Sequence, residues 1–225
     1  MKRLNIFLLI HKGLRALLYD TALQLQHTEF TNEKEAEAAL EALGETILLF
    51  EEHARKEDSI ILPAITEYEP SIVDCFESEH ALDSALGEQL VVSMEAFRTI
   101  SGSSEKILAG YQLNTAFVEF MVFNLEHMAK EENIINPILW RYYTDEEIGK
   151  IQKKIIDTTE PWFMHLFTKW MLKGINNTEA FQWMNTVSKT APQVYEMICE
   201  YAQKQLSPGR YRSLMNSLSQ SALAA

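Results

Sequence analysis

Glycine and proline are scarce in this chain of 225 residues, with eight glycines and six prolines. These two residues make up roughly 12% of an average protein, so the chain has about half the usual number of turn formers. Few turns leave long uninterrupted elements, which favours an all-helical protein. The only two cysteines, Cys75 and Cys199, are too few for a disulfide framework, and we expect both to be small buried residues.

Positive charge is also scarce: 20 Lys and Arg stand against 32 Asp and Glu, which gives a net charge of −12. Such a balance argues against a general partner for nucleic acid or for an anionic membrane. The excess lies in residues 1–144, which hold 11 basic and 24 acidic residues, whereas residues 145–225 hold 9 and 8. Acidic helix faces are usually just solvated, but an acidic bundle also concentrates metal cations.

Long apolar runs are missing. An apolar run from Leu4 to Ile10 follows Lys2 and Arg3, but it ends at His11 and no small-residue cleavage site comes after it. No other run reaches the length of a membrane span. The sequence therefore predicts a cytoplasmic protein without a membrane partner.

What the chain does have is helical periodicity. Apolar residues recur at three-four spacing over about residues 4–29, from Asn32 to the residues before Pro70, over 71–97 and over 104–139. Four long helices with short connections predict an all-α fold, an up-down-up-down four-helix bundle over residues 1–142. Residues 143–225 are predicted to form a C-terminal helical extension of shorter helices packed on the bundle.

An internal repeat divides the bundle into two similar halves. Residues 53–65 read HARKEDSIILPAI and residues 127–139 read HMAKEENIINPIL, with His, Lys, Glu, Ile, Ile and Pro at the same places. A lone histidine precedes each segment by a similar distance, His11 by 42 residues and His80 by 47. The halves are thus two helix pairs of one design, each with one His followed by His-x-x-x-Glu.

The polar residues of this repeat lie on the apolar stripes of their helices. Residues four apart share one helix face, so each His-x-x-x-Glu pair points the same way. Buried imidazoles and carboxylates are costly unless something satisfies them, and together they suit iron, zinc, manganese or nickel. Six ligands with two shared carboxylates fit two metals better than one. The candidate ligands are His11, His53, Glu57, His80, His127 and Glu131.

Two alternatives compete with this kind of metal site. A single histidine on a bundle stripe is more often a satisfied core residue than a ligand, but the duplicated set argues against this for all six. Ferritin-type diiron proteins use Glu-x-x-His on two helices. This chain has one such spacing, Glu77 to His80, and no second one at a matching place.

The pattern His11, His53-x-x-x-Glu57, His80, His127-x-x-x-Glu131 resembles the hemerythrin-like family, the HHE cation-binding domain, over about residues 4–140. The resemblance implies a four-helix bundle that holds a non-haem, oxo- or hydroxo-bridged diiron centre. It implies that Glu57 and Glu131 bridge the irons and that the four histidines are terminal ligands. The extra third-helix histidine of the oxygen-carrying members is absent, since Phe76 and Ser84 occupy the positions four from His80. The ligand pattern is closest to the repair-of-iron-centres branch, which is associated with oxidative and nitrosative stress.

Several acids near these residues have roles that the sequence leaves open. Asp58 and Glu132 follow the two glutamates and are expected to face outward. Glu79 and Asp83 flank His80, and either support the ligands, form a path for iron, or are ordinary surface acids.

Three classes of function remain open from the sequence. The chain is a diiron protein that binds or reacts with oxygen, nitric oxide or peroxide or handles iron under stress, or a non-catalytic module that senses or stores oxygen or iron. As an enzyme it needs an external electron donor, because no reductase domain is recognisable. The third class is a helical scaffold with buried histidines and no metal.

Overall fold

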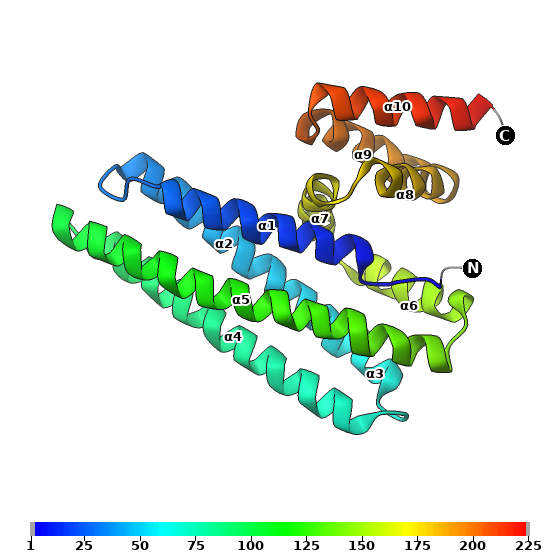
Figure 1. Ribbon diagram of the computed structural model, residues 1–225, viewed down its shortest axis with the longest axis horizontal. Coiled ribbons are helices and arrows are strands. Elements are labelled where there is room, and N and C mark those ends of the chain that lie inside the picture. Colours follow the sequence, from blue (N-terminus) through cyan, green and yellow to red (C-terminus); the bar gives the residue numbers. More distant parts are fainter. Residues whose placement is uncertain (1–2, 224–225) are drawn as a thin grey trace. The chain divides into compact units, whose positions relative to one another are not determined.

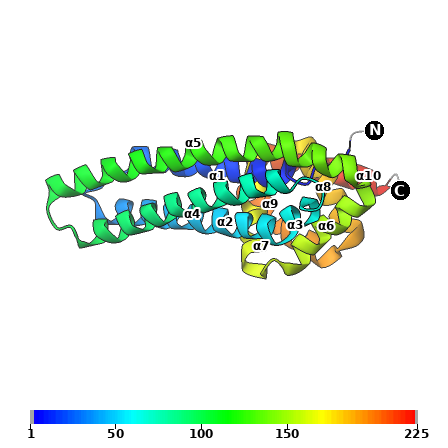
Figure 2. The ribbon, with the colours of Figure 1, turned by 90° about the horizontal axis from the view of Figure 1, so that it is seen from below.

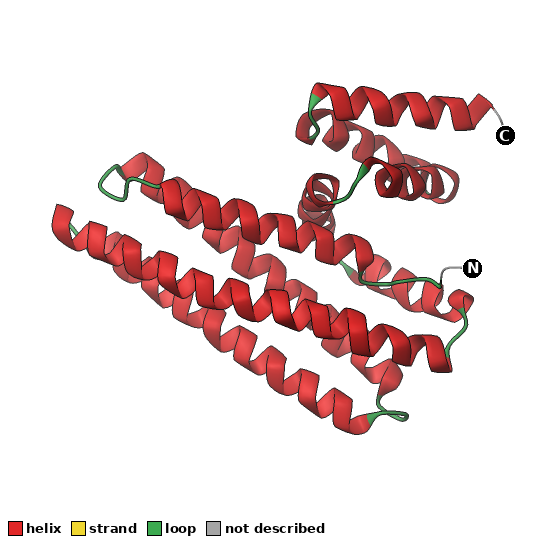
Figure 3. Cartoon of the chain, viewed as in Figure 1, coloured by secondary structure: helices red, strands yellow, loops and turns green. Residues whose placement is uncertain are grey.

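The computed structural model describes residues 3–223, and every regular element in that range is a helix (Figure 3). None of the helices described combines the length and the hydrophobicity that a membrane crossing requires. The chain forms two compact units. The first contains the residues up to Phe7 and Leu17–Thr159, and the second contains Leu8–Ala16 and the residues from Glu160 onward.

The first unit is a bundle of long helices that alternate in direction (Figures 1 and 2). Its elements are the later part of α1 (Leu8–His27), α2 (Glu33–Lys56), the π-helical turn η1 (Glu57–Ile61), α3 (Leu62–Ile65), α4 (Pro70–Thr99), α5 (Ser103–Tyr142) and α6 (Asp145–Thr158). The longest helices, α4 and α5, run antiparallel beside each other. The predicted all-α bundle is confirmed.

The helix ends follow from local sequence. Asn32 caps α2, because its side chain accepts hydrogen bonds from the backbone N–H groups of Lys34 and Glu35. Pro70 begins α4, where its missing N–H costs nothing. Thr144 and Glu147 form a reciprocal capping box at the start of α6.

The interior of the first unit is apolar around the polar layer described below. Toward one end of the bundle, α3, α4, α5 and α6 pack on a cluster that includes Ile65, Phe76, Leu139 and Ile148, each at most 2% exposed. Farther along the bundle, the rings of Phe50 and Phe120 meet edge to face with centroids 5.5 Å apart. The polar layer lies between these two groups of apolar contacts.

The π turn η1 interrupts the second long helix just before Pro63, where a kink or a helix end was expected. A π turn contains one residue more than an α turn, and here the N–H of Leu62 reaches back to the carbonyl of Glu57. Pro63, which follows directly, has no N–H to donate to Ser59. Pro137 at the matching place of the repeat lies inside α5, which continues to Tyr142. The two halves therefore differ in backbone although their sequences align.

The second unit holds α7 (Pro161–Gly174), α8 (Asn177–Thr190), α9 (Pro192–Gln205), α10 (Pro208–Leu223) and the first turns of α1. Its core includes Leu172, Met184, Ile198 and Leu214, each at most 1% exposed. The backbone of α1 contacts that of α7 closely. A Cβ on Gly13 would lie 2.8 Å from the backbone nitrogen of Met171, so only glycine fits there.

The prediction that both cysteines are buried is wrong. The cysteines are not both buried, because Cys75 is exposed and Cys199 is half-buried. Cys75 lies on the solvent side of α4, next to the inward-facing Phe76.

The domain boundary at residues 142 and 143 stays a prediction, and α6 belongs to the first compact unit.

Candidate metal centre

Four of the six predicted ligands converge inside the first unit. One ligand atom each from Glu57, His80, His127 and Glu131 lies within 4.8 Å of the others. All four residues are buried, with exposed fractions from 0% to 6%. They come from η1, α4 and α5, so the bundle brings together residues up to 74 positions apart in the sequence.

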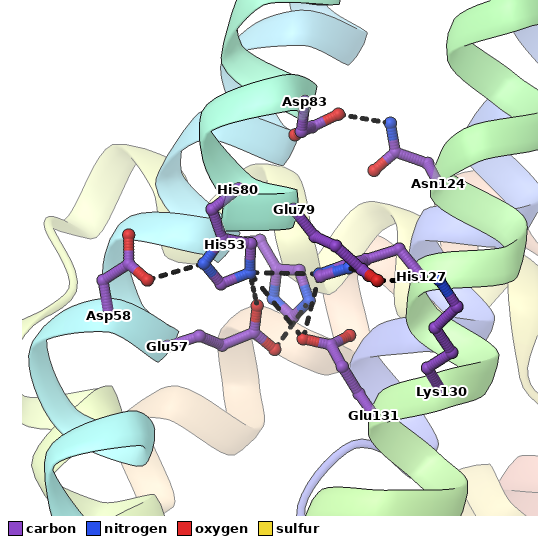
Figure 4. Close-up of polar contacts among 10 residues, drawn as sticks. All are labelled: His53, Glu57, Asp58, Glu79, His80, Asp83, Asn124, His127, Lys130 and Glu131. Atoms are coloured by element: carbon purple, nitrogen blue, oxygen red, sulfur yellow. Dashed lines mark hydrogen bonds and ion pairs between the residues drawn. The ribbon is translucent and has the colours of Figure 1, made fainter. Parts of the chain in front are cut away.

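The imidazole Nε2 atoms point toward the two carboxylates (Figure 4). The Nε2 atom of His80 lies 3.5 Å from Glu57 Oε2 and 3.9 Å from Glu131 Oε1. The Nε2 atom of His127 lies 3.2 Å from Glu131 Oε1 and 3.0 Å from His80 Nε2. Four donor atoms thus face one small volume, as in a metal site.

His53 approaches the same carboxylates from α2. Its Nε2 atom lies 3.1 Å from Glu57 Oε1, the contact expected for residues four apart on one helix face. Ligand atoms of His53, Glu57 and Glu131 also lie within 4.8 Å of one another. Glu57 and Glu131 are therefore common to two groups of ligand atoms.

His11 lies on α1 and is 0% exposed. It belongs to the part of α1 that forms the second unit. On a regular helix it shares a face with Leu18 and Leu25, which are buried in the first unit. Its role as a ligand stays a prediction.

The Nδ1 atoms of two imidazoles contact carboxylates outside this layer. His80 Nδ1 lies 2.5 Å from Asp58 Oδ1, and His127 Nδ1 lies 2.8 Å from Glu79 Oε2. Lys130 donates to the other oxygen of Glu79 at 2.7 Å. Burial opposes ionisation of Glu79, but the hydrogen bonds from Lys130 and His127 outweigh it and lower its pKa.

These contacts favour protonated imidazoles when no metal is bound. Burial works against the charge on His80, but hydrogen bonds to Asp58, Glu131 and Glu57 outweigh it and raise the pKa of His80 to about 12. For His127, burial is likewise outweighed, mainly by Glu131, and the pKa rises to about 9. Protons therefore compete with metal cations for this layer.

A cavity of about 560 Å³ lies between α2, η1 and α4 and reaches His80. Four acids line it together with His80: Glu51, Asp58, Glu77 and Asp83. Asp83 is only 6% exposed and accepts a hydrogen bond from Asn124 Nδ2 at 2.5 Å, and burial raises its pKa. Asp83 thus lines the cavity next to the polar layer.

Sequence reasoning missed two features of this region. Asp58 is exposed as expected, yet it contacts His80, because the π turn changes the direction in which residues after Glu57 point. Lys56 is only 5% exposed, and its ammonium donates to the carbonyl of Thr158 at 2.6 Å. The sequence has a Lys at the matching place of each repeat, Lys56 and Lys130, which was a signal that this position matters. Nothing in the sequence indicated that Lys56 contacts the end of α6.

Three further polar residues lie outside the cluster. Glu77, the ferritin-like spacing partner of His80, is exposed at the cavity wall. His27 is exposed, and His165 packs against Tyr201 in the second unit with ring centroids 5.7 Å apart.

The donor set fits a divalent metal. Two carboxylates and the imidazoles of His53, His80 and His127 are all buried within one layer. Burying so many ionisable groups is costly without a cation to neutralise the carboxylates. Mixed imidazole and carboxylate ligands suit first-row transition metals, and no thiolate is present in the group.

Comparison with known proteins agrees with this geometry. Several of the relatives are F-box/LRR-repeat protein 5 from different species. The Xenopus laevis protein is 27% identical over 144 residues, which is 61% of this chain and 20% of the relative. The Mus musculus protein is 26% identical over 152 residues, 68% of this chain and 21% of the relative. An Arabidopsis thaliana zinc finger protein BRUTUS-like is 22% identical over 145 residues, 64% of this chain and 11% of the relative.

The chain thus spans only about a fifth or less of the length of these relatives. No solved structure gives a significant match. The family model described as the hemerythrin HHE cation-binding domain matches residues 3–139, which is more than half of the chain and contains all six predicted ligands. The chain therefore belongs to the hemerythrin HHE cation-binding domain family.

Proposed function

We propose that this chain is a non-haem diiron protein whose centre binds small ligands such as oxygen, nitric oxide or peroxide. Glu57 and Glu131 would be shared by both irons. His80 and His127 would complete one position, and His53 together with His11 the other. The irons supply redox and ligand-binding chemistry, and the protein supplies the buried, preorganised ligands.

The observation that carries this proposal is the sharing of two carboxylates. Glu57 and Glu131 belong to one group of ligand atoms with His80 and His127, and they also lie within the same short range of His53. A mononuclear site would not need two carboxylates that each reach imidazoles on more than one helix. Carboxylates that serve two ligand groups are suited to bridging two cations.

The cavity at His80 supports access of a small ligand. It has a volume of about 560 Å³ and reaches the polar layer between α2 and α4. The buried Asp83, at the same wall, is a carboxylate with a raised pKa that is suited to holding a proton near the centre. Repeated turnover would need electrons from an external donor, and we propose the cytoplasm as the place of action.

Iron loading tests the proposal. The full chain is purified without chelator, loaded with ferrous iron under anaerobic conditions, and its metal content is measured by elemental analysis. We expect about two irons per chain, and a change of the visible absorption spectrum when nitric oxide or oxygen is admitted. One iron or none per chain would contradict the diiron assignment.

A second candidate function is a non-catalytic sensing module. Lys56, next to Glu57, donates a hydrogen bond to the carbonyl of Thr158 in the last turn of α6. A change in η1 on iron binding would thereby reach α6. In the relatives, the matched segment is a small part of a protein whose name denotes F-box and LRR repeats or a zinc finger. Hydrogen exchange at the end of α6 that differs between iron-loaded and metal-free protein would favour sensing.

The ligand pattern also resembles the repair-of-iron-centres branch, and a role in oxidative or nitrosative stress is part of our proposal. The relatives described above carry other names, so this role rests on the ligand pattern alone.

A further inference from the structure

The outward-facing nitrogens of His80 and His127 are each held by a carboxylate from another helix or turn. Asp58 in η1 contacts His80 of α4 at 2.5 Å, and Glu79 of α4 contacts His127 of α5 at 2.8 Å. An ionised carboxylate only accepts hydrogen bonds, so each Nδ1 atom carries the hydrogen and donates it. The proton on Nδ1 leaves Nε2 of the neutral ring available as a ligand atom.

The two carboxylates are themselves fixed by the fold. Asp58 directly follows Glu57 in the π turn, which places these neighbours on His80 from two sides (Figure 4). Glu79 directly precedes His80, and its second oxygen accepts from Lys130 of α5 at 2.7 Å. The two imidazoles, the shared carboxylates of Glu57 and Glu131, and the outer carboxylates of Asp58 and Glu79 therefore form one chain of contacts across η1, α4 and α5.

These contacts differ from ordinary surface ion pairs. The side chains of both imidazoles are only 5% exposed, and that of Glu79 is 18% exposed. Asp58 is 45% exposed, but its partner is buried and faces the ligand layer. A hydrogen bond to a buried ring restricts both ring rotation and tautomer, whereas an exposed pair contributes little.

We propose that Asp58 and Glu79 are positioning residues that fix the ring orientation and tautomer of His80 and His127, so that one metal position of the centre is assembled before the metal arrives. This proposal rests on the diiron function proposed above. Carboxylate partners of this kind also raise the basicity of a ligating imidazole. Loss of one such partner typically weakens metal binding about 10–100-fold.

The test compares alanine and amide variants in the full chain. Asp58→Ala and Glu79→Ala remove the acceptor, whereas Asp58→Asn and Glu79→Gln keep an oxygen that accepts from Nδ1. The matched control is Glu126→Ala, which removes an exposed acid next to His127 that belongs to neither carboxylate–imidazole pair. Each protein is titrated anaerobically with ferrous iron in competition with a chromophoric chelator.

We expect each alanine variant to bind one of its two irons about 10–100-fold more weakly than the unmodified chain. The amide variants should recover most of that loss, and Glu126→Ala should bind as the unmodified chain does. Cobalt(II) absorption provides a second readout: its ligand-field bands should shift in the alanine variants and return in the amide variants. The melting temperatures of the metal-free variants are measured as well. A variant that is only less stable would not show this recovery in the amide form.

The outcomes separate this inference from the function on which it rests. An unmodified chain that binds no iron would overturn the diiron function. If the unmodified chain binds two irons and both alanine variants match it, the positioning roles are wrong. Amide variants as weak as the alanine variants would also overturn them, because charge and not hydrogen bonding would then control affinity.

Discussion

The Nε2 atoms of His80 and His127 lie 3.0 Å apart, although one ring comes from α4 and the other from α5. Both nitrogens face the carboxylates of Glu57 and Glu131, which favour a proton on each ring when no metal is bound. A metal placed among these atoms would replace those protons. Stability, pH and metal binding are therefore coupled in this layer.

The metal-free protein should lose stability as pH rises. An unfolded histidine has a pKa of about 6.5, and folding raises the pKa of His127 to about 9. A raised folded-state pKa contributes stability that is fully present below the unfolded value and is lost as pH climbs toward the folded value. Chelator-treated protein should melt several degrees lower at about pH 9 than at about pH 6.

A control isolates His127 in that experiment. His127→Gln should reduce the pH dependence without removing it, because His80, whose pKa is raised to about 12, still contributes, whereas His27→Ala, which changes an exposed histidine, should keep the full dependence. A melting temperature that rises steadily from about pH 6 to about pH 9 would contradict the expected direction.

Removing either shared carboxylate should abolish most iron binding. Glu57 and Glu131 are 1% and 0% exposed and each reaches imidazoles on more than one helix. We expect Glu57→Ala and Glu131→Ala to fall from about two irons per chain to below one, since both positions lose a ligand. Elemental analysis after gel filtration measures this, with Glu126→Ala as the matched control. Full iron content in either variant would mean that another residue bridges the metals.

Iron should raise the melting temperature. A ligand at about 1,000 times its Kd stabilises the folded state by about 4 kcal/mol, which corresponds to roughly 10 °C for a domain of this size. Scanning calorimetry of iron-loaded and chelated protein checks this. Equal melting temperatures would show that the buried polar layer is stable without metal, as in the scaffold alternative.

Lys56 should be needed for stability although it is not a candidate ligand. Lys56→Met keeps the aliphatic stem but leaves the carbonyl of Thr158 and the buried Glu52 without the ammonium. Glu52 keeps the two hydrogen bonds that Arg55 donates, so the expected loss is that of one hydrogen bond from a charged group, about 1.5–3 kcal/mol in urea unfolding. Lys150→Met, at a side chain that is 71% exposed, should change stability by less than about 0.5 kcal/mol.

Two helical glycines should respond oppositely to alanine. Gly13→Ala places a methyl group 2.8 Å from the backbone of Met171 in the second unit and should destabilise the protein. A Cβ on Gly149 of α6 meets nothing within 4 Å, so Gly149→Ala should stabilise by about 0.5–1 kcal/mol through helix propensity. Thermal melts of both variants decide. Equal effects would contradict the close packing of α1 on α7.

Periodicity and repetition made much of this structure predictable. The apolar stripes placed the long helices within a few residues of their observed ends, with Asn32 marking the start of α2 and Pro70 the end of the segment before α4. The repeated His-x-x-x-Glu pairs indicated which polar residues would meet inside. These features are local or recur at a fixed spacing, so a single sequence contains them.

Contacts that depend on a change of helical phase were not predictable. Pro63 and Pro137 occupy matching places, yet only the first follows a π turn. The contact of Asp58 with His80 depends on that turn, and the contact of Lys56 with Thr158 depends on where α6 ends. Each joins residues far apart in the chain whose geometry no periodicity encodes.

The π turn also breaks the symmetry of the repeat. Only the first half contains η1, and the cavity that η1 helps to line reaches His80. The two iron positions proposed here would therefore be chemically inequivalent, with an incoming ligand meeting the His80 position first. Mössbauer spectra of the loaded protein would then show two distinct iron environments, and ligand binding would perturb one of them before the other.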